Sequence, residues 1–512
     1  MIIENNILKG ALLIGAFFLL DGNVFSQNDV LELLPGAKTL EYDTRTGVHR
    51  LIGNVNFLYQ GNNMYCDSAH YFERQKRVRA YGHVHINKKD TLNLFCDSLF
   101  YDGRTKQAKL WGNVRVRDNE FKLTTDTLDY DAKKGQAHYH HGGKVESIIT
   151  QESLTSRVGY FHPNSKNFFF SQNVDYKGID LSMQTDTLQY VYNQKKTYFY
   201  GPTDIQTGEA TMYCESGWYH TESGKGALYT NAWMSRELDY IAADTLRYEP
   251  DIGVSIGIGN VYYKDSTQNL SFNGDYAFNS DSLNYAYVTG HALATKELSN
   301  DTMYVHADTL YNMKLGSVSI LKAYYRVKLF STKIQCTSDS MSYSSETQKI
   351  ELRSTPIVWS NEAELKGDII DVYMNDSVID KVNIYGNSSV LMEIEPTLYY
   401  NQIAGKNIEA YFKDNDLHRA DVLGNAITLF FPIDEESTDS SYIKKRVGMN
   451  RLYASDLRIY IDSNNITGIT YIDQAEGVFY PMEKIKKEEQ FIPGFDWKNA
   501  LRPKSKETLF ED

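Results

Sequence analysis

Hydrophobic and polar residues alternate over most of the chain, in runs short enough to be single strands. In the run LWGNVRVR, the residues Leu110, Gly112, Val114 and Val116 share one face, and the arginines fall on the other. A period of two residues is the period of an extended strand. Such runs end at clusters of Gly, Asp and Lys, for example residues 102–105, which are typical of turns. The pattern predicts antiparallel strands joined by tight turns.

A longer pattern repeats with a period of about 30 residues. Its first half reads apolar, any, small, acid, any, apolar, any, Tyr, as in FCDSLFYD (95–102), and its second half reads apolar-Gly-Asn-Val. The acidic anchors recur every 29 to 33 residues, except for one interval of 60 that holds a degenerate unit around residues 157–161: Asp67, Asp97, Asp126, Asp186, Glu215, Asp244, Asp275, Asp308, Asp339 and Asp368. With looser copies near residues 40, 407 and 456, we count about thirteen units. A fixed period of this kind predicts an elongated repeat stack.

The phase of the alternation changes inside each first half. Leu94 and Cys96 share one face, whereas Asp97, Leu99 and Tyr101 are in the opposite phase. A slip of one residue turns a strand's apolar set to the other face unless the backbone bends or bulges. We therefore predict a corner between the small residue and the acid, so that each strand folds over an interior and gives a trough that is V-shaped in section.

Composition, net charge and the N-terminal segment indicate where the protein works. The chain has 39 Tyr and 23 Phe but only 10 Pro, which favours strands, and its net charge of −13 without a basic patch excludes a nucleic-acid partner. Lys9 precedes the apolar run Ala11–Leu20, and Val24 and Ser26 occupy small-residue positions before a cut after Ser26. This is typical of a secretory signal peptide. We predict that residues 1–26 are removed and that the mature chain works outside the cytoplasm.

The cysteines allow two interpretations. Cys66, Cys96 and Cys214 occupy the small position before the acid, and Cys336 lies two residues before that position. The favoured interpretation is that Cys is one of several small residues tolerated there. A Cys66–Cys96 disulfide is the alternative, since secreted proteins permit disulfides.

No residue pattern indicates catalysis. His138 and His140 share a predicted strand face and are the sole metal candidates, but we favour a polar rim, because no Cys or carboxylate ligand set accompanies them. The repeated acids resemble paired catalytic carboxylates only superficially, since residues that recur in every unit serve the architecture. We expect them to bond turn amides or to end strands. The predictions are no enzyme activity, no cofactor and no metal.

The combined pattern resembles the OstA-like family, which includes the periplasmic lipopolysaccharide bridge protein LptA and the N-terminal domain of LptD. The best matches are residues 95–102 with 110–116, and 242–249 with 257–263. This chain is longer than the bridge proteins and is closer to the long OstA-like proteins of Bacteroidetes-type bacteria. The resemblance implies an all-β fold, an elongated antiparallel β-jellyroll (β-taco) stack over residues 27–476, V-shaped in section.

The resemblance also implies a function. An apolar β-groove would carry the acyl chains of lipopolysaccharide or another envelope lipid through the periplasm towards the outer membrane, by passive sliding. LptC-like inner-membrane and LptD-like outer-membrane components would be its partners. The candidate groove residues are Leu99, Val114, Leu128, Leu188, Leu246, Val261 and Leu310.

Three questions stay open. A ligand-free structural solenoid would fill its interior with side chains, especially Tyr101, Tyr130 and Tyr248, and a carbohydrate-binding envelope protein would expose aromatic ladders. The tail 477–512 breaks the repeat, and its segment FIPGFDW contains Phe495 and Trp497. These two rings either dock a partner or belong to a cap over the last rung.

Overall fold

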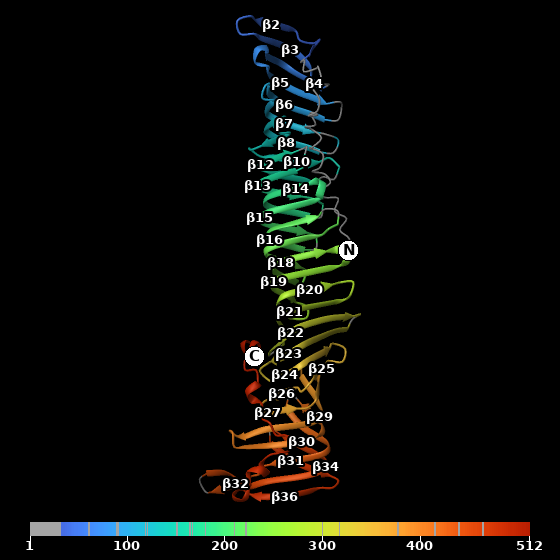
Figure 1. The fold of residues 1–512 in the computed structure, drawn as a ribbon, viewed down its shortest axis with the longest axis vertical. Helices are drawn as coiled ribbons and strands as arrows, with labels where there is room; N and C mark the ends of the chain where they lie inside the picture. The colour runs from blue at the N-terminus through green and yellow to red at the C-terminus, as the bar shows by residue number, and fades with distance from the viewer. Residues whose placement is uncertain are drawn as a thin grey trace. The chain divides into compact units, whose positions relative to one another are not determined.

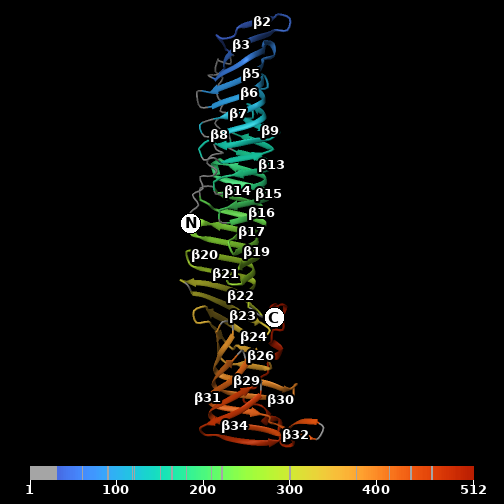
Figure 2. The same cartoon turned by 180° about the vertical axis from the view of Figure 1, so that it is seen from behind.

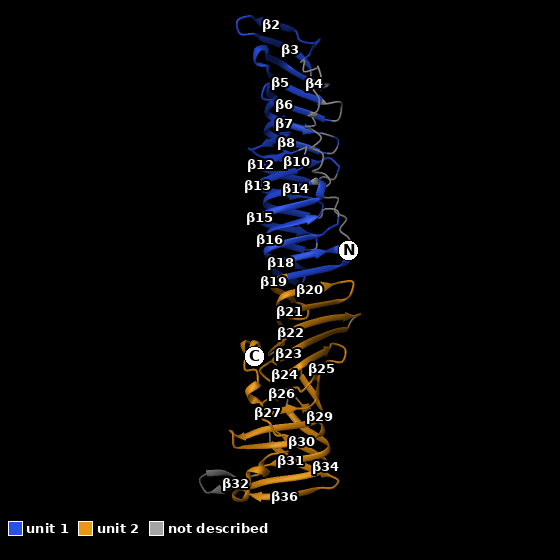
Figure 3. Ribbon diagram, viewed as in Figure 1, with its two compact units in different colours: residues 1–257 blue, residues 258–512 orange. Residues whose placement is uncertain are grey.

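The structure is a computed structural model that describes residues 32–511, apart from 60–61, 89–91, 118, 120, 150–151, 163–164, 166, 180, 209, 221–222, 299–300, 317, 376–377, 414–415, 439–440 and 463–464. The predicted signal peptide lies outside the described residues. The chain divides into two compact units, Met1–Gly257 and Ile258–Asp512 (Figure 3). Within the described ranges, no helix has the length and apolar character needed to cross a membrane.

Unit 1 is a stack of antiparallel strands whose rungs follow chain order (Figures 1 and 2). Its elements are β1 (Glu32–Leu34), β2 (Thr39–Asp43), β3 (Val48–Tyr59), β4 (Asn62–Phe72), η3 (Glu73–Gln75), β5 (Arg77–Lys88), β6 (Leu92–Asp102), β7 (Gln107–Arg117), β8 (Phe121–Asp131), β9 (Gln136–Tyr139), β10 (Gly143–Ser147), β11 (Ser153–Ser156), β12 (Val158–His162), β13 (Asn167–Lys177), β14 (Leu181–Val191), η4 (Tyr192–Gln194), β15 (Lys196–Thr207), β16 (Ala210–His220), β17 (Gly226–Arg236), β18 (Asp239–Glu249) and η5 (Pro250–Ile252). The degenerate unit is where single strands split into the shorter pairs β9/β10 and β11/β12.

Unit 2 repeats the same construction with longer strands at its end. Its elements are β19 (Val254–Asp265), which begins just before the boundary, β20 (Leu270–Ser280), β21 (Tyr285–Glu297), β22 (Thr302–Leu315), β23 (Val318–Phe330), β24 (Ile334–Ser344), β25 (Lys349–Arg353), β26 (Ile357–Ser360), β27 (Ala363–Lys366), β28 (Ile369–Asn375), β29 (Val378–Glu395), β30 (Tyr399–Lys413), β31 (Asp416–Phe430), β32 (Ile433–Thr438), β33 (Ser441–Arg446), β34 (Gly448–Asp462), β35 (Asn465–Ile472), β36 (Glu476–Pro481), η6 (Met482–Lys484), η7 (Lys487–Gln490), η8 (Asn499–Leu501) and η9 (Glu507–Phe510). The all-β antiparallel stack predicted from the sequence is confirmed in both units.

The predicted corner is present at the small–acid junction. Between β6 and β7 the pairing runs through Phe95↔Arg115, skips, and resumes at Ser98↔Trp111. Three residues of β7 are skipped, Gly112, Asn113 and Val114, and the φ angles of the first two, 76° and 50°, lie in the left-handed region. This is a bulge that bends the sheet. The same shift recurs between most successive strand pairs, for example β4–β5 and β21–β22.

The corner also corrects two expectations. Gly112 does not share the interior face with Val114, because a Cβ built on it would lie 2.4 Å from Oδ2 of Asp97. Six of the ten anchor acids accept a hydrogen bond from a side chain of the neighbouring strand instead of from a turn amide. Asn113 Nδ2 donates to Asp97 Oδ2 at 2.8 Å, and five more anchors accept a hydrogen bond from the matching left-handed residue of the neighbouring strand: Asp67, Glu215, Asp275, Asp308 and Asp368. The repeated acid therefore ties one corner to the next.

The turns at the strand ends follow the sequence prediction. Asp102 Oδ1 accepts hydrogen bonds from the backbone N–H groups of Arg104 and Thr105 at 3.0 and 3.3 Å. Asp131 holds the equivalent turn through Lys133 and Lys134. Local side-chain bonding of this type is why Asp opens so many turns.

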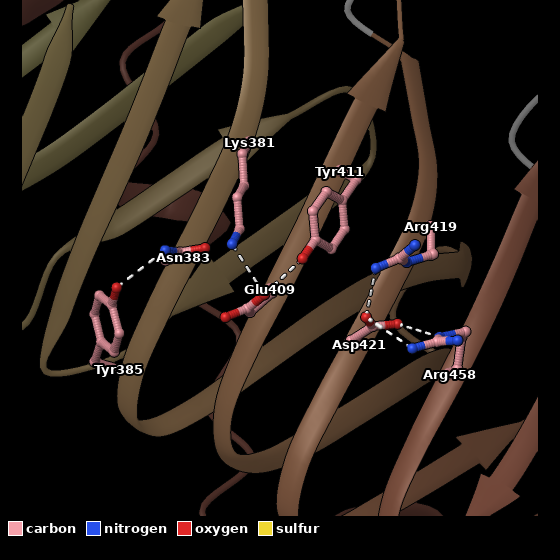
Figure 4. A network of polar contacts seen from close by, with 8 residues as sticks. All are labelled: Lys381, Asn383, Tyr385, Glu409, Tyr411, Arg419, Asp421 and Arg458. Carbon is pink, nitrogen blue, oxygen red and sulfur yellow. Dashed lines mark hydrogen bonds and ion pairs between the residues drawn. The ribbon is translucent and has the colours of Figure 1, made fainter. Parts of the chain in front are cut away.

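The outer face of one wall of unit 2 carries a polar network (Figure 4). Glu409 Oε2 accepts hydrogen bonds from Lys381 Nζ at 2.9 Å and from Tyr411 Oη at 2.6 Å. Asp421 accepts from Arg419 Nη2 and Arg458 Nε, both at 2.8 Å. These residues alternate along their strands with core residues, so the network stabilises the sheet from outside.

Candidate functional site

The interior of unit 1 is packed in one section and open in another. The packed reference is β6–β8, where two inward rows consist of large apolar side chains that are all 5% exposed or less: Leu94, Val116 and Leu123, then Leu99, Leu110 and Leu128. Such close packing leaves no room for a ligand.

The corresponding rows in β16–β18 are accessible to solvent, except at Gly217, which is buried. The inward residues there, which we call the open section, are Met212, Met234 and Ile241 on one wall and Gly217, Leu228, Leu246, Tyr219, Gly226 and Tyr248 on the other. Met234 is 37% exposed and Tyr248 is 47% exposed, and Leu228 and Leu246 are half-buried. The register is the same as in β6–β8, so the same backbone frame holds an unfilled interior.

Side-chain volume explains the opening. Gly217 stands where Leu99 stands in the packed section, and Gly226 replaces Ala108. Two methionines line the opposite wall, and Met is a flexible side chain that suits adaptable apolar contacts. The open section therefore keeps the apolar character of the interior but lacks the side chains that fill it.

The turn on each side of the open section carries one large apolar side chain that is exposed. Leu238 lies in the turn between β17 and β18 and is 58% exposed, and Ile252 lies in η5 and is 54% exposed. Turn residues are ordinarily polar. The two side chains extend the apolar surface to both lips of the trough.

Charges near the open section lie at its mouth. Lys225 Nζ is 3.1 Å from Glu249 Oε2 and 3.7 Å from Asp251 Oδ2, and this pairing raises the pKa of Lys225. Arg236 ends β17 at the other lip and is exposed. At the corner, burial raises the pKa of the Cys214 thiol to about 12, so it is a neutral apolar group at neutral pH. An apolar floor with charges at the rim fits an amphiphile, with its chain inside and its polar group outside.

The predicted groove residues all face inward, but they do not share one environment. Leu99, Val114, Leu128, Leu188, Val261 and Leu310 are buried in the packed interior. Leu246 alone among the seven belongs to the open section. In unit 2 the interior of the described residues includes a cavity of about 20 Å³ lined by Met303, Cys336 and Val372 among others, which holds about one water molecule.

The residues that sequence reasoning missed are Met212, Leu228 and Met234. A signal for them existed, because the motif YCESGWYH (213–220) has Gly217 at the position that holds Leu in the neighbouring units. The consequence of that glycine depends on the side chains of the adjacent strands, which a single unit does not show.

The tail does not point away from the molecule, and its first part packs on the last strands, with Met482, Ile485 and Ile492 in one cluster with Leu429 of β31 and Met449 of β34. After β36 it runs back along unit 2, with its end beside β23 (Figures 1 and 2). Phe495 and Trp497 pack on Tyr400 with ring centroids 5.2 and 5.3 Å apart, and Lys498 N donates to Glu364. Leu509 is fully buried.

A cleft of about 1320 Å³ lies between residues 496–511 and the corner of unit 2. Its lining mixes cations with acids, such as Arg326 paired with Asp308.

The structure also shows the environment of the cysteines and of the two candidate histidines. Cys66 and Cys96 are free, buried thiols, as are Cys214 and Cys336, so the disulfide alternative is not supported. His138 and His140 share a face, as predicted, with centroids 4.6 Å apart, and His138 Nε2 is 3.5 Å from Asp129 Oδ2. Among the described residues no three His, Cys, Asp or Glu side chains gather in a metal-binding arrangement.

The fold places the chain in a class of proteins: repetitive antiparallel β-stacks whose longer strands bend at a corner around an apolar interior. Residues 33–186 match the family described as OstA-like protein, so this segment is similar to that family. The matched segment ends before the open section.

One solved structure with a detectable similarity is that of LptH, the LptA homologous periplasmic component of the conserved lipopolysaccharide transport device from Pseudomonas aeruginosa. The identity is 12% and the TM-score is 0.20, over 22% of this chain and 81% of that chain. A similarity of this size supports no argument about function. No curated protein matches the chain.

Proposed function

We propose that the chain is a non-catalytic periplasmic protein of the lipopolysaccharide transport type, which holds the acyl chains of lipopolysaccharide or another envelope lipid in the open section. The observation that carries the proposal is that Met234 and Tyr248 of β16–β18 are exposed and Leu228 and Leu246 are half-buried, whereas their counterparts in β6–β8 are all buried: Val116, Tyr130, Leu110 and Leu128. Exposed apolar surface is unfavourable in water, and covering it with an acyl chain gains about 0.8 kcal/mol per methylene. The site thus favours a lipid chain.

The family assignment of residues 33–186 supports the setting of this function. A transport role implies partners that deliver and receive the lipid, and we propose LptC-like inner-membrane and LptD-like outer-membrane components, with the protein in the periplasm or at the outer membrane. Phe495 and Trp497 are poor candidates for a first contact with such partners, because their rings already pack on Tyr400.

Photo-crosslinking in cells tests the lipid site. A photoreactive phenylalanine analogue at Leu246 faces the open section, and the same group at Arg247 faces the opposite side of β18. We expect lipopolysaccharide adducts from position 246 and none from position 247, because only the inward position meets the acyl chain. Equal capture at both positions, or no adduct at 246 in protein that accumulates normally, contradicts the proposal.

The second candidate function is a ligand-free scaffold, and the packed part of unit 1 favours it. Tyr130 is buried in the interior, and Tyr101 is half-buried beside it, as a filled solenoid requires. Tyr248, at the equivalent position of the open section, is not buried. Mass spectrometry of protein purified under mild conditions separates the two functions: stoichiometric bound lipid supports transport, and lipid-free protein supports the scaffold.

A further inference from the structure

An aromatic block fills the interior of unit 1 immediately before the open section. It consists of six rings from β9 to β15, each at most 1% exposed: Tyr139, Phe161, Phe168, Phe170, Tyr190 and Phe199. The rings contact one another edge to face, as with Phe161 and Phe170, whose centroids are 5.7 Å apart at 82°. Contacts of this geometry add to the gain from burial, so the block is a well-packed part of the core.

The inward rows show that the block and the open section share one channel. Phe170, Leu188, Phe199, Gly217, Leu228 and Leu246 are successive partners in the strand register from β13 to β18. The first four are buried, and the last two are half-buried. The change from filled to open therefore occurs at one step, between Phe199 and Leu228.

Phe199 and Gly217 define that step. A Cβ built on Gly217 would lie 2.4 Å from Cε2 of Phe199, so the phenyl ring occupies the space of the missing side chain. The opposite wall changes from buried to accessible at the same strand. Met183 and its partner Ile205 are buried, whereas Met212, which pairs with Ile205 on the next strand, is half-buried. No continuous unfilled path leads from the open section past β15 in the described interior.

We propose that the aromatic block is a fixed end stop for the acyl chain, with Phe199 as the residue that sets how far a chain enters. This inference rests on the proposed function and adds a limit to it. A lipid then enters and leaves sideways, between the lips at Leu238 and Ile252, and does not slide along the interior of unit 1. The passive sliding that the family resemblance implied is replaced, for this unit, by a discrete site with a closed end.

Chain-length dependence of binding tests the end stop. The probes are saturated fatty acids of 10 to 18 carbons, measured by calorimetry with the full mature chain. Each methylene that becomes buried raises the affinity about fourfold. For the wild type we expect this rise to stop once the open section is full. In Phe199→Ala the stop is removed, so the rise continues to longer chains, by about fourfold for each added methylene.

Phe168→Ala is the matched control. It removes the same ring from the same block, but Phe168 lies in the other row, where Tyr190 and Thr197 separate it from Tyr219 of the open section. In this variant the affinity is expected to stop rising at the same fatty-acid chain length as in the wild type. Phe199→Leu, which keeps an apolar side chain, gives the same direction of change if the alanine variant does not fold.

The outcomes separate the two proposals. A plateau that is unchanged in folded Phe199→Ala and Phe199→Leu overturns the end stop and leaves the lipid site intact. A wild-type affinity that rises through all chain lengths also overturns the end stop. Failure of every fatty acid to bind the wild type overturns the lipid site, and the end stop with it.

Discussion

Replacing equivalent leucines in the packed and open sections should give different losses of stability. Leu128 and Leu246 occupy the same position of the repeat, three residues after the small corner residue, and both face inward. Leu128 is 1% exposed, whereas Leu246 is half-exposed. The perturbation is the single substitution Leu→Ala at each position, so the deleted atoms are identical.

The magnitudes follow from burial. Leu128→Ala removes a buried side chain and leaves a cavity in a close-packed interior, which costs about 2–5 kcal/mol. Leu246→Ala deletes atoms that water already reaches on one side, so no closed cavity forms and only part of the transfer free energy is lost. We expect about 1 kcal/mol for this variant.

Hydrogen exchange read by mass spectrometry is the suitable assay, because a repeat stack does not unfold in a single two-state step. A loss of 2–5 kcal/mol raises the local opening constant by about 30-fold or more, and 1 kcal/mol raises it about fivefold. Peptides of β7–β8 report on Leu128→Ala, and peptides of β17–β18 report on Leu246→Ala.

Equal changes in exchange at the two sites, or a larger change at Leu246, would refute the reasoning that β16–β18 is open. A second readout keeps stability apart from function. Leu246→Ala should weaken binding of a fatty acid, since Leu246 is expected to contact the chain, whereas Leu128→Ala should leave binding unchanged despite its larger effect on stability.

Three further predictions concern the frame and the buried groups. Gly112→Ala should destabilise the corner by about 1–3 kcal/mol, because φ is positive there and the new methyl group meets Asp97; a thermal shift near zero would contradict this. Asp421→Asn should cost about 1–3 kcal/mol, because the carboxylate that pairs Arg419 with Arg458 is lost, and an unchanged denaturation midpoint would argue against a stabilising network (Figure 4). Burial raises the pKa of the Cys336 thiol from 9.0 to about 12, so its thiolate fraction at pH 8 falls about a thousandfold; a disulfide exchange reagent should react only after unfolding, and rapid titration of the native protein would contradict the burial.

The sequence was sufficient for the frame of this fold, because the frame depends on local chemistry. An acid such as Asp97 and a left-handed pair such as Gly112–Asn113 sit at fixed spacing, and together they bend two neighbouring strands at one place. Alternation then decides which side chains enter the interior. For that reason Leu99, Leu128 and Leu246 could all be assigned to the inward face before the structure was known.

The occupancy of the interior could not be predicted in the same way. Whether an inward leucine is buried depends on partners that come from neighbouring strands, 11 to 19 residues away for Leu99, and from the opposite wall. Gly217 is itself buried, because the ring of Phe199 occupies the space that a side chain would take there, and the opening begins at its partner Leu228 on the next strand. The path of the tail was unpredictable for a related reason, since residues 482–511 have no period and their position is set by contacts such as those with Glu364 and Tyr400.

The backbone arrangement of the strands and the packing of side chains in the interior are therefore separate properties of this chain. The corner is fixed by backbone conformation and by hydrogen bonds on the outside of the bend, and it is the same in β6–β8 as in β16–β18. The interior is fixed by side-chain volume alone. A repeat protein built in this way can convert a stabilising core into a binding trough by a few large-to-small changes, without altering strand register. In unit 1 such large-to-small changes are found in the open section, next to the aromatic block. The proposed lipid site therefore lies in the open section and does not extend along all of unit 1.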